Sequence, residues 1–189
     1  MNHLYEQLTA LKLTGFRDAL KKQLAQPGTY QELGFEERLS LLTAEELTCR
    51  ENRKAERLIK HARFRLNAEL SKLDYRNNRG LDRALIRSLS QGNWLTLKQN
   101  ILLTGATGSG KTFLACALGH NACRQGYKVY YYRLKALMEQ CYQGHADGRY
   151  SKLLTRLNNS DLLLLDDWGL EPLSSEQRSD LQIGRASCR

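Results

Sequence analysis

The sequence predicts an α/β fold in which helices flank a parallel sheet, preceded by a small all-helical segment. Short apolar runs at residues 101–103, 129–132 and 162–165 have the length of buried strands and are separated by helical stretches. Strands that alternate with helices in this way favour a parallel sheet. A glycine-rich stretch directly follows the first run and opens a helical one. Residues 2–66, in contrast, carry leucines at helical spacing.

The helical segment is expected to break at residues 26–29 (QPGT) and to continue as one long helix from near Phe35 to about Leu66. The stretch that follows is expected to hold an extended piece, a loop and a brief helix, at residues 70–75, 77–80 and 82–89. The predicted organisation is therefore a helical N-terminal domain, a connector and an α/β core, at residues 1–66, 67–99 and 100–182.

Charge and composition indicate a soluble protein with a polyanionic partner. Of 189 residues, 29 are Lys or Arg and 20 are Asp or Glu, which gives a formal net charge of +9. Much of the excess follows Arg50, and a localised basic zone favours nucleic acid. No apolar run has the length of a membrane span, and no secretory signal is recognisable. Reduced thiols of a cytoplasmic protein are predicted rather than disulfides or a zinc site. The cysteines are Cys49, Cys116, Cys123, Cys141 and Cys188.

A row of cations is predicted on one face of the long helix. At about 100° per residue, the basic residues fall on one side, and Leu58, Ile59 and Ala62 fall on the other. A membrane-surface helix would need a larger apolar face. Contact with the DNA backbone is therefore favoured over a merely solvated face. The candidate DNA-binding residues are Arg50, Arg53, Lys54, Arg57, Lys60 and Arg65.

The stretch GATGSGKT fits the phosphate-binding pattern G-x-x-x-x-G-K-S/T, between a predicted strand and a predicted helix. Its glycines permit the backbone angles that turn successive N–H groups toward phosphates. Lys111 is expected to reach the β and γ oxygens of a nucleotide, and the Thr112 hydroxyl to ligate Mg²⁺. The candidate nucleotide-binding residues are Gly105, Ala106, Thr107, Gly108, Ser109, Gly110, Lys111 and Thr112.

A second motif, DLLLLDD, is predicted to supply the acidic groups of the same site. Four buried leucines that end in two carboxylates are typical of a Walker B strand. Asp166 is expected to hold the Mg²⁺ shell, and Asp167 to polarise the water that attacks the γ-phosphate. The three consecutive tyrosines 130–132 are predicted to be half-buried sheet residues rather than a stacking platform for bases.

Together these stretches resemble the IstB-like ATPases, which are insertion-sequence transposition helpers related to DnaC-type helicase loaders within the AAA+ class. The resemblance covers the chain to about residue 182 and rests on GFEERLSLL, ENRKAERLIKHARFR, RGLDRALIRSL, QNILLTGATGSGKTFLACALGHNACRQGYKV and DLLLLDDWGLEPLSSEQRSDL. It implies an AAA+-type P-loop domain that binds ATP with Mg²⁺ and self-associates. It also implies an N-terminal part that contacts double-stranded DNA, and a cognate transposase as partner.

The C-terminal part departs from this family, whose members continue with a sensor strand, an arginine finger and a lid. Residues 183–189 (IGRASCR) read as the in-frame translation of a sequencing adapter and are predicted to be an artefact. Without the sensor strand, the backbone groups of residues 101–103 and 162–165 would lack partners, at about 1–3 kcal/mol each. We therefore expect the 189-residue chain to fold poorly or aggregate, and not to be a competent ATPase. A cooperative thermal melt with stoichiometric Mg-ATP binding would contradict this.

Three alternatives to a transposition helper stay open for the intact protein. A helicase loader would use the same chemistry with a replicative helicase as its client. A DNA-binding scaffold would use ATP only for assembly, and Asp167→Asn would then stop turnover and leave the action on DNA intact. A small-molecule P-loop kinase would need an acceptor pocket and a lid that the sequence does not reveal.

Overall fold

The structure is a computed structural model that describes residues 2–75, 81–170 and 172–186. It divides into two compact units, Met1–Ala55 and Glu56–Arg189. The loop expected at residues 77–80 lies outside the described residues, as does Cys188.

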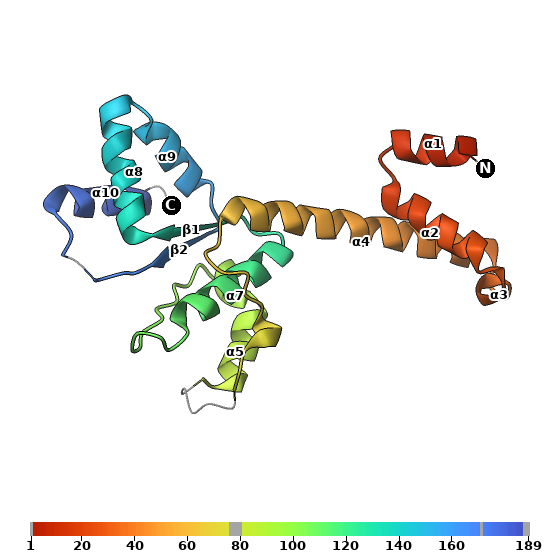
Figure 1. Ribbon diagram of the computed structural model, residues 1–189, viewed down its shortest axis with the longest axis horizontal. Coiled ribbons are helices and arrows are strands. Elements are labelled where there is room, and N and C mark those ends of the chain that lie inside the picture. The colour runs from red at the N-terminus through yellow and green to blue at the C-terminus, as the bar shows by residue number, and fades with distance from the viewer. Residues whose placement is uncertain (1, 76–80, 171, 187–189) are drawn as a thin grey trace. The chain divides into compact units, whose positions relative to one another are not determined.

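The first unit is all-helical, as predicted (Figure 1). It contains α1 (Asn2–Ala10), α2 (Thr14–Ala25), α3 (Pro27–Tyr30) and the first part of α4 (Phe35–Ala62). Pro27 stands at the first position of α3, where its missing N–H costs nothing and its fixed φ suits a helix. The predicted break in the helical segment therefore ends α2 and begins a new short helix.

A buried carboxylate fastens α2 to α4 in this unit. Glu46 accepts the backbone N–H of Phe16 at 3.0 Å and pairs with Arg50 at 2.7 Å. The two helices approach closely because Gly15 has no side chain; a Cβ there would lie 2.7 Å from the Cβ of Cys49. Burial alone would raise the pKa of Glu46, but the hydrogen bonds from Arg50, Phe16 and Gly15 outweigh it and lower that pKa. Arg50 thus serves the packing of this unit.

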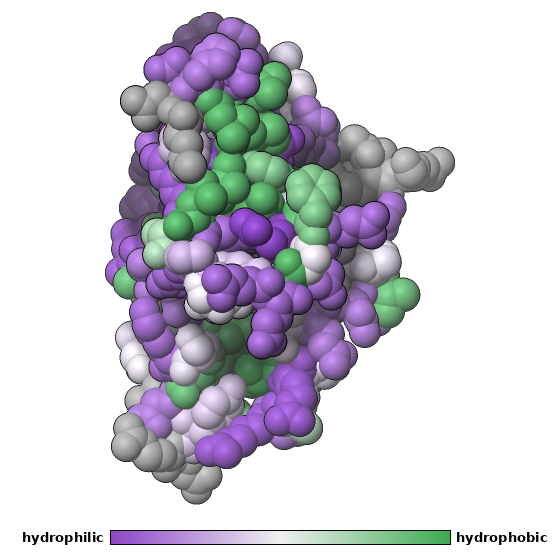
Figure 2. All heavy atoms as spheres, turned by 90° about the vertical axis from the view of Figure 1, so that its right-hand side faces the viewer, coloured by the Kyte–Doolittle hydropathy of each residue, from purple (hydrophilic) through white to green (hydrophobic). Residues whose placement is uncertain are grey.

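The first unit leaves several large apolar side chains exposed to solvent. Phe35 is 80% exposed and Leu47 is 62% exposed. Figure 2 shows apolar surface lying open between hydrophilic side chains. A small helical unit of this size cannot cover all of its leucines, because surface grows relative to volume as a unit shrinks.

The second unit holds a parallel two-stranded sheet at its centre, so the predicted α/β class is confirmed (Figure 1). The strands β1 (Val129–Arg133) and β2 (Leu162–Asp166) pair in register, with Arg133 opposite Asp166. Because the strands are parallel, both carboxyl ends lie at one edge of the sheet. The acidic end of β2 is thereby placed at the edge where α/β proteins bind their ligands.

Helix α7 (Lys111–Arg124) covers one face of this sheet. Val129 and Tyr131 point to this face and pack with alanines and cysteines of α7. The approach is close at Gly119, where a Cβ would lie 2.8 Å from Leu164. Small residues on α7 therefore let the helix lie directly on the sheet.

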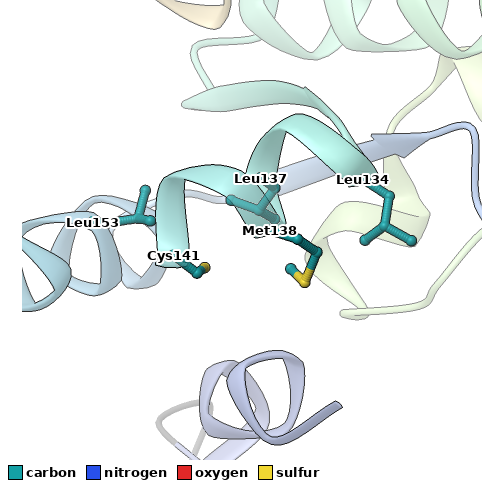
Figure 3. Packing of buried hydrophobic residues seen from close by; sticks show 5 residues of the cluster. All are labelled: Leu134, Leu137, Met138, Cys141 and Leu153. Carbon is teal, nitrogen blue, oxygen red and sulfur yellow. The ribbon is translucent and has the colours of Figure 1, made fainter. Parts of the chain in front are cut away.

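The opposite face is covered by α8 (Leu134–Asp147), on which α9 (Tyr150–Asn158) packs. Four buried residues of α8 and Leu153 of α9 form one cluster, shown in Figure 3. Tyr132 packs against this cluster from the sheet. The predicted tyrosine run is thus divided between the two faces by the alternation of side chains along a strand.

The strand expected at residues 101–103 does not form. Ile101 and Leu103 pack against a cluster around Leu114 of α7, whereas Leu102 is 81% exposed. The side chains therefore alternate as in a strand, but among the described residues no neighbouring strand lies between this segment and β2. An isolated extended segment has no ladder hydrogen bonds and is not a strand.

The expected connector, residues 67–99, lies within the second unit and packs against α7. Instead of an extended piece at residues 70–75, the structure has a 3-10 turn at Leu70–Lys72, because backbone bonds close locally. The brief helix is confirmed as α5 (Arg83–Ser90), followed by α6 (Asn93–Thr96). Ile86 of α5 is buried against α7.

Helix α10 (Ser175–Ala186) runs across the predicted boundary at residues 182 and 183. The origin assigned to residues 183–189 stays a prediction.

Among the helices in the described ranges, none combines the length and apolar character that crossing a membrane requires.

Candidate functional site

The glycine-rich loop leads directly into the N-terminus of α7. Gly108 has φ 80° and Gly110 has φ 92°, both in the left-handed region that glycine adopts without steric cost. Gly110 is the N-cap, and no acidic residue occupies the first turn of α7. The positive end of the helix and its N–H groups therefore face an anion that enters the loop. The exposed residues of the loop are Gly105, Ala106, Thr107, Gly108 and Ser109.

Lys111 folds back over this loop. Its Nζ donates to the carbonyl oxygens of Gly105 and Ala106, each at 2.8 Å. An ammonium has three donors, so the two carbonyls hold the charge at the mouth of the loop with capacity for a further acceptor. The lysine is thus kept beside the backbone that is predicted to bind phosphate.

The structure brings Thr112 and Asp166 into contact, 54 residues apart in the chain. The Thr112 hydroxyl lies 2.9 Å from Oδ2 and 3.2 Å from Oδ1 of Asp166. Two groups that the sequence did not associate with the site also reach this carboxylate. Tyr131 donates its hydroxyl to Oδ2 at 2.6 Å, and Arg65 lies 3.9 Å from the same oxygen.

These neighbours keep Asp166 ionised. Burial raises the pKa of this carboxyl, but hydrogen bonds from Tyr131, Thr112 and the N–H of Asp167, with the charge of Arg65, outweigh burial and lower the pKa. The pKa of the Tyr131 phenol shifts in the opposite direction: burial raises it, and so does the adjacent carboxylate of Asp166. The site therefore presents a carboxylate beside a neutral phenol at neutral pH.

The donor set fits a magnesium ion. Mg²⁺ prefers oxygen ligands and is usually held by one or two protein groups, with nucleotide phosphates and water completing its shell. Thr112 and Asp166 supply a hydroxyl and an ionised carboxylate in contact with each other. In the part of the chain that the structure describes, no cluster of three His, Cys, Asp or Glu side chains forms a metal cage. These residues therefore suit a Mg²⁺ ion that is held jointly by the protein and by nucleotide phosphates.

Asp167 turns away from the strand end at a left-handed φ of 58°. Its carboxylate lies 3.5 Å from Nε of Arg133, the last residue of β1. The predicted water activator is therefore engaged by an arginine of the neighbouring strand, and its catalytic role stays a prediction.

A cavity of about 1280 Å³ extends from this pair between α8, the segment after β2 and α10. Arg133 and Asp167 line it, together with the exposed Tyr142 and Leu170. None of residues 105–112 lines it. The glycine-rich loop is thus an exposed surface feature that is not part of this cavity.

The predicted row of DNA-binding cations is only partly placed on α4. The helix ends at Ala62, where Arg63 takes a φ of 56°, so Arg65 lies beyond it and faces Asp166. The expectation of a helical face through Arg65 was wrong at this end, because the left-handed residue turns the chain toward the sheet. Arg53 donates to the Thr14 hydroxyl. Side chains of Lys54, Arg57 and Lys60 are exposed.

Sequence reasoning missed Tyr131 and Arg65 as neighbours of the site. Strand alternation alone separates Tyr131 from Tyr130 and Tyr132, and the register then selects Tyr131, because it stands opposite Leu164 and Asp166 is two residues further along β2 on the same face. No such signal existed for Arg65, whose position depends on where α4 ends.

A glycine-rich loop lies between a packed apolar segment and α7, and the acidic end of β2 contacts the Thr112 hydroxyl at the start of that helix. This arrangement is that of a P-loop NTPase domain, here with an incomplete sheet. The family model described as IstB-like ATP binding protein matches residues 6–183. The chain belongs to this family.

Several relatives carry names from insertion sequences. One from Pseudomonas fluorescens, named as an ATP-binding protein of insertion sequence IS1162, is 46% identical over 95% of this chain and 78% of its own length. An insertion sequence ATP-binding protein of Sinorhizobium fredii is 40% identical over 93% of this chain and 71% of its own length. The IS21 ATP-binding protein of Pseudomonas aeruginosa is 29% identical over 95% of this chain and 67% of its own length.

Proposed function

We propose that this protein is an ATP-binding helper of DNA transposition that assembles on double-stranded DNA and assists a cognate transposase. The observation that carries the proposal is the contact between Thr112 and Asp166 at the start of α7. It joins the two motifs that the sequence offers for a nucleotide and its metal.

ATP with Mg²⁺ is the proposed ligand. The α7 N-terminus and Lys111 present positive charge to phosphates, and Thr112 with Asp166 suits the metal. When bound, Mg²⁺ would neutralise charge on the β and γ phosphates. The names of the relatives, which refer to ATP binding, agree with this choice.

Double-stranded DNA is the proposed polyanion. The net charge of +9 and the exposed cations of α4 support it, because phosphate contacts by Lys and Arg supply most sequence-independent affinity. The relatives' names favour an insertion sequence over a replicative helicase as the setting, and thus a transposase as the client. Self-association on the DNA, which the resemblance implies, is part of the proposal.

The proposal predicts that ATP promotes assembly on DNA. We expect the chain with a 30-base-pair duplex to sediment as a larger complex in Mg²⁺ and ATP than in Mg²⁺ alone, since ligands that favour the same state raise each other's affinity. Sedimentation velocity with fluorescent DNA measures this. Equal complexes with and without ATP, from a chain that binds ATP, would contradict ATP-dependent assembly. The variant Lys111→Ala serves as the control for nucleotide effects that do not involve the loop.

A further inference from the structure

Tyr131 makes a contact that neither motif accounts for. Its hydroxyl donates to Oδ2 of Asp166 at 2.6 Å, which is short for a hydroxyl donor and typical of a bond to a charged acceptor. The tyrosine is 9% exposed, and its ring packs among Ala68, Cys116 and Ala117. The phenol is therefore fixed by packing and aimed at the carboxylate that is proposed to receive the metal.

The register of the sheet explains why Tyr131 in particular reaches this carboxylate. Tyr131 lies opposite Leu164, so Asp166 is its diagonal neighbour on the same face of β2. The 2.6 Å hydrogen bond shows that the tyrosine side chain reaches this diagonal position. Tyr130 and Tyr132, one residue away on either side, belong to the other face by the alternation of the strand. The three tyrosines are thus equivalent in composition but not in position.

The contact restricts the orientation of Asp166. Its Oδ1 accepts the N–H of Asp167 at 3.0 Å, and its Oδ2 accepts Tyr131. One donor on each oxygen fixes the plane of the carboxylate, and the Thr112 hydroxyl then lies against both oxygens. Without the phenol, the Oδ2 side would be held only by Thr112 and by the more distant, half-exposed Arg65.

We propose that Tyr131 is a positioning residue for the metal side of the nucleotide site: its hydroxyl holds Asp166 in the orientation that suits Mg²⁺ beside Thr112. The inference rests on the proposed function, because it assigns a role within the ATP site. Hydrogen-bond partners of metal ligands orient those ligands and tune their affinity, and their loss typically weakens metal binding about 10- to 100-fold.

The test uses Tyr131→Phe, which removes the hydroxyl and keeps the ring that packs against α7. Affinity for a fluorescent ATP analogue is measured on the full chain in excess Mg²⁺ and again in EDTA. We expect Tyr131→Phe to weaken binding in Mg²⁺ by about tenfold and to leave binding in EDTA unchanged. Tyr132→Phe, on the opposite face, is the matched control and should change neither value.

The ratio of the two affinities separates positioning from packing. A loss of packing would weaken binding equally in both buffers and leave the ratio of the two affinities unchanged. An unchanged ratio, with or without weaker binding, would overturn the proposal. In an Asp166→Asn background the metal carboxylate is absent, so Tyr131→Phe should add no further change in the ratio. If the unmodified chain shows a cooperative thermal melt but binds the analogue in neither buffer, the proposed ATP function has failed. Magnesium-dependent binding that is unchanged by Tyr131→Phe rejects only this inference.

Discussion

Lys111→Ala is expected to abolish tight ATP binding. Lys111 is held at the mouth of the phosphate loop by two carbonyls, where its charge can pair with the terminal phosphates. A hydrogen bond to a charged group contributes about 1.5–3 kcal/mol, so loss of the one bond that the third donor of Lys111 can make to a phosphate should weaken binding by about ten- to a hundredfold. Equilibrium dialysis with radiolabelled ATP in Mg²⁺ measures the effect.

The control for this variant is Lys152→Ala, which removes an exposed lysine of α9. Low stability of the chain would not obscure the comparison. If only part of the population is folded, the apparent dissociation constant is the intrinsic one divided by the folded fraction, which cancels between variants that are equally folded. Unchanged nucleotide affinity in Lys111→Ala, with ordinary circular dichroism spectra for both proteins, would count decisively against the loop as the ATP site.

Neutralising Arg53, Arg57 and Lys60 together by glutamine is expected to flatten the salt dependence of DNA binding. Each phosphate contact contributes about 0.9 to the slope of log affinity against log salt concentration. Loss of three contacts should therefore reduce the slope by up to about 2.7. Fluorescence anisotropy of a labelled duplex at several salt concentrations measures it.

The matched control removes three exposed cations outside α4, by glutamine at Lys128, Lys152 and Arg156. This set lowers the net charge by the same amount, so a general effect of charge would appear in both variants. A slope that changes equally in the two, or in neither, would mean that the α4 row is a solvated surface.

The fold class was predictable because strand and helix periods are local properties of the sequence. Residues 129–132 and 162–165 are apolar runs of strand length, and the structure pairs them in parallel. The segment 101–103 has the same composition, yet it forms no strand, since a strand depends on a neighbour as much as on its own residues. Periodicity alone cannot supply the neighbour.

Two parts of the candidate site were predictable, because the chemistry of each requires certain residues at a fixed spacing in the sequence. The loop and the acidic strand end are recognisable singly, and the structure adds the contact between Thr112 and Asp166. Arg65 was assigned to a helix face, but the left-handed backbone at Arg63 ends α4 earlier and directs Arg65 to Asp166. Tyr131 looked like its two neighbours in sequence, and only the strand register distinguishes it.

The most direct test of the central claim, that the loop at residues 105–112 holds the phosphates of ATP, is chemical labelling with an acyl phosphate of ATP. The amine of a lysine near the γ-phosphate attacks the acyl carbon of this probe, and ATP leaves. We predict that mass spectrometry will find Lys111 as the labelled lysine, and that excess Mg-ATP will prevent its labelling. Labels spread over surface lysines such as Lys54 and Lys152, unaffected by ATP, would contradict the account.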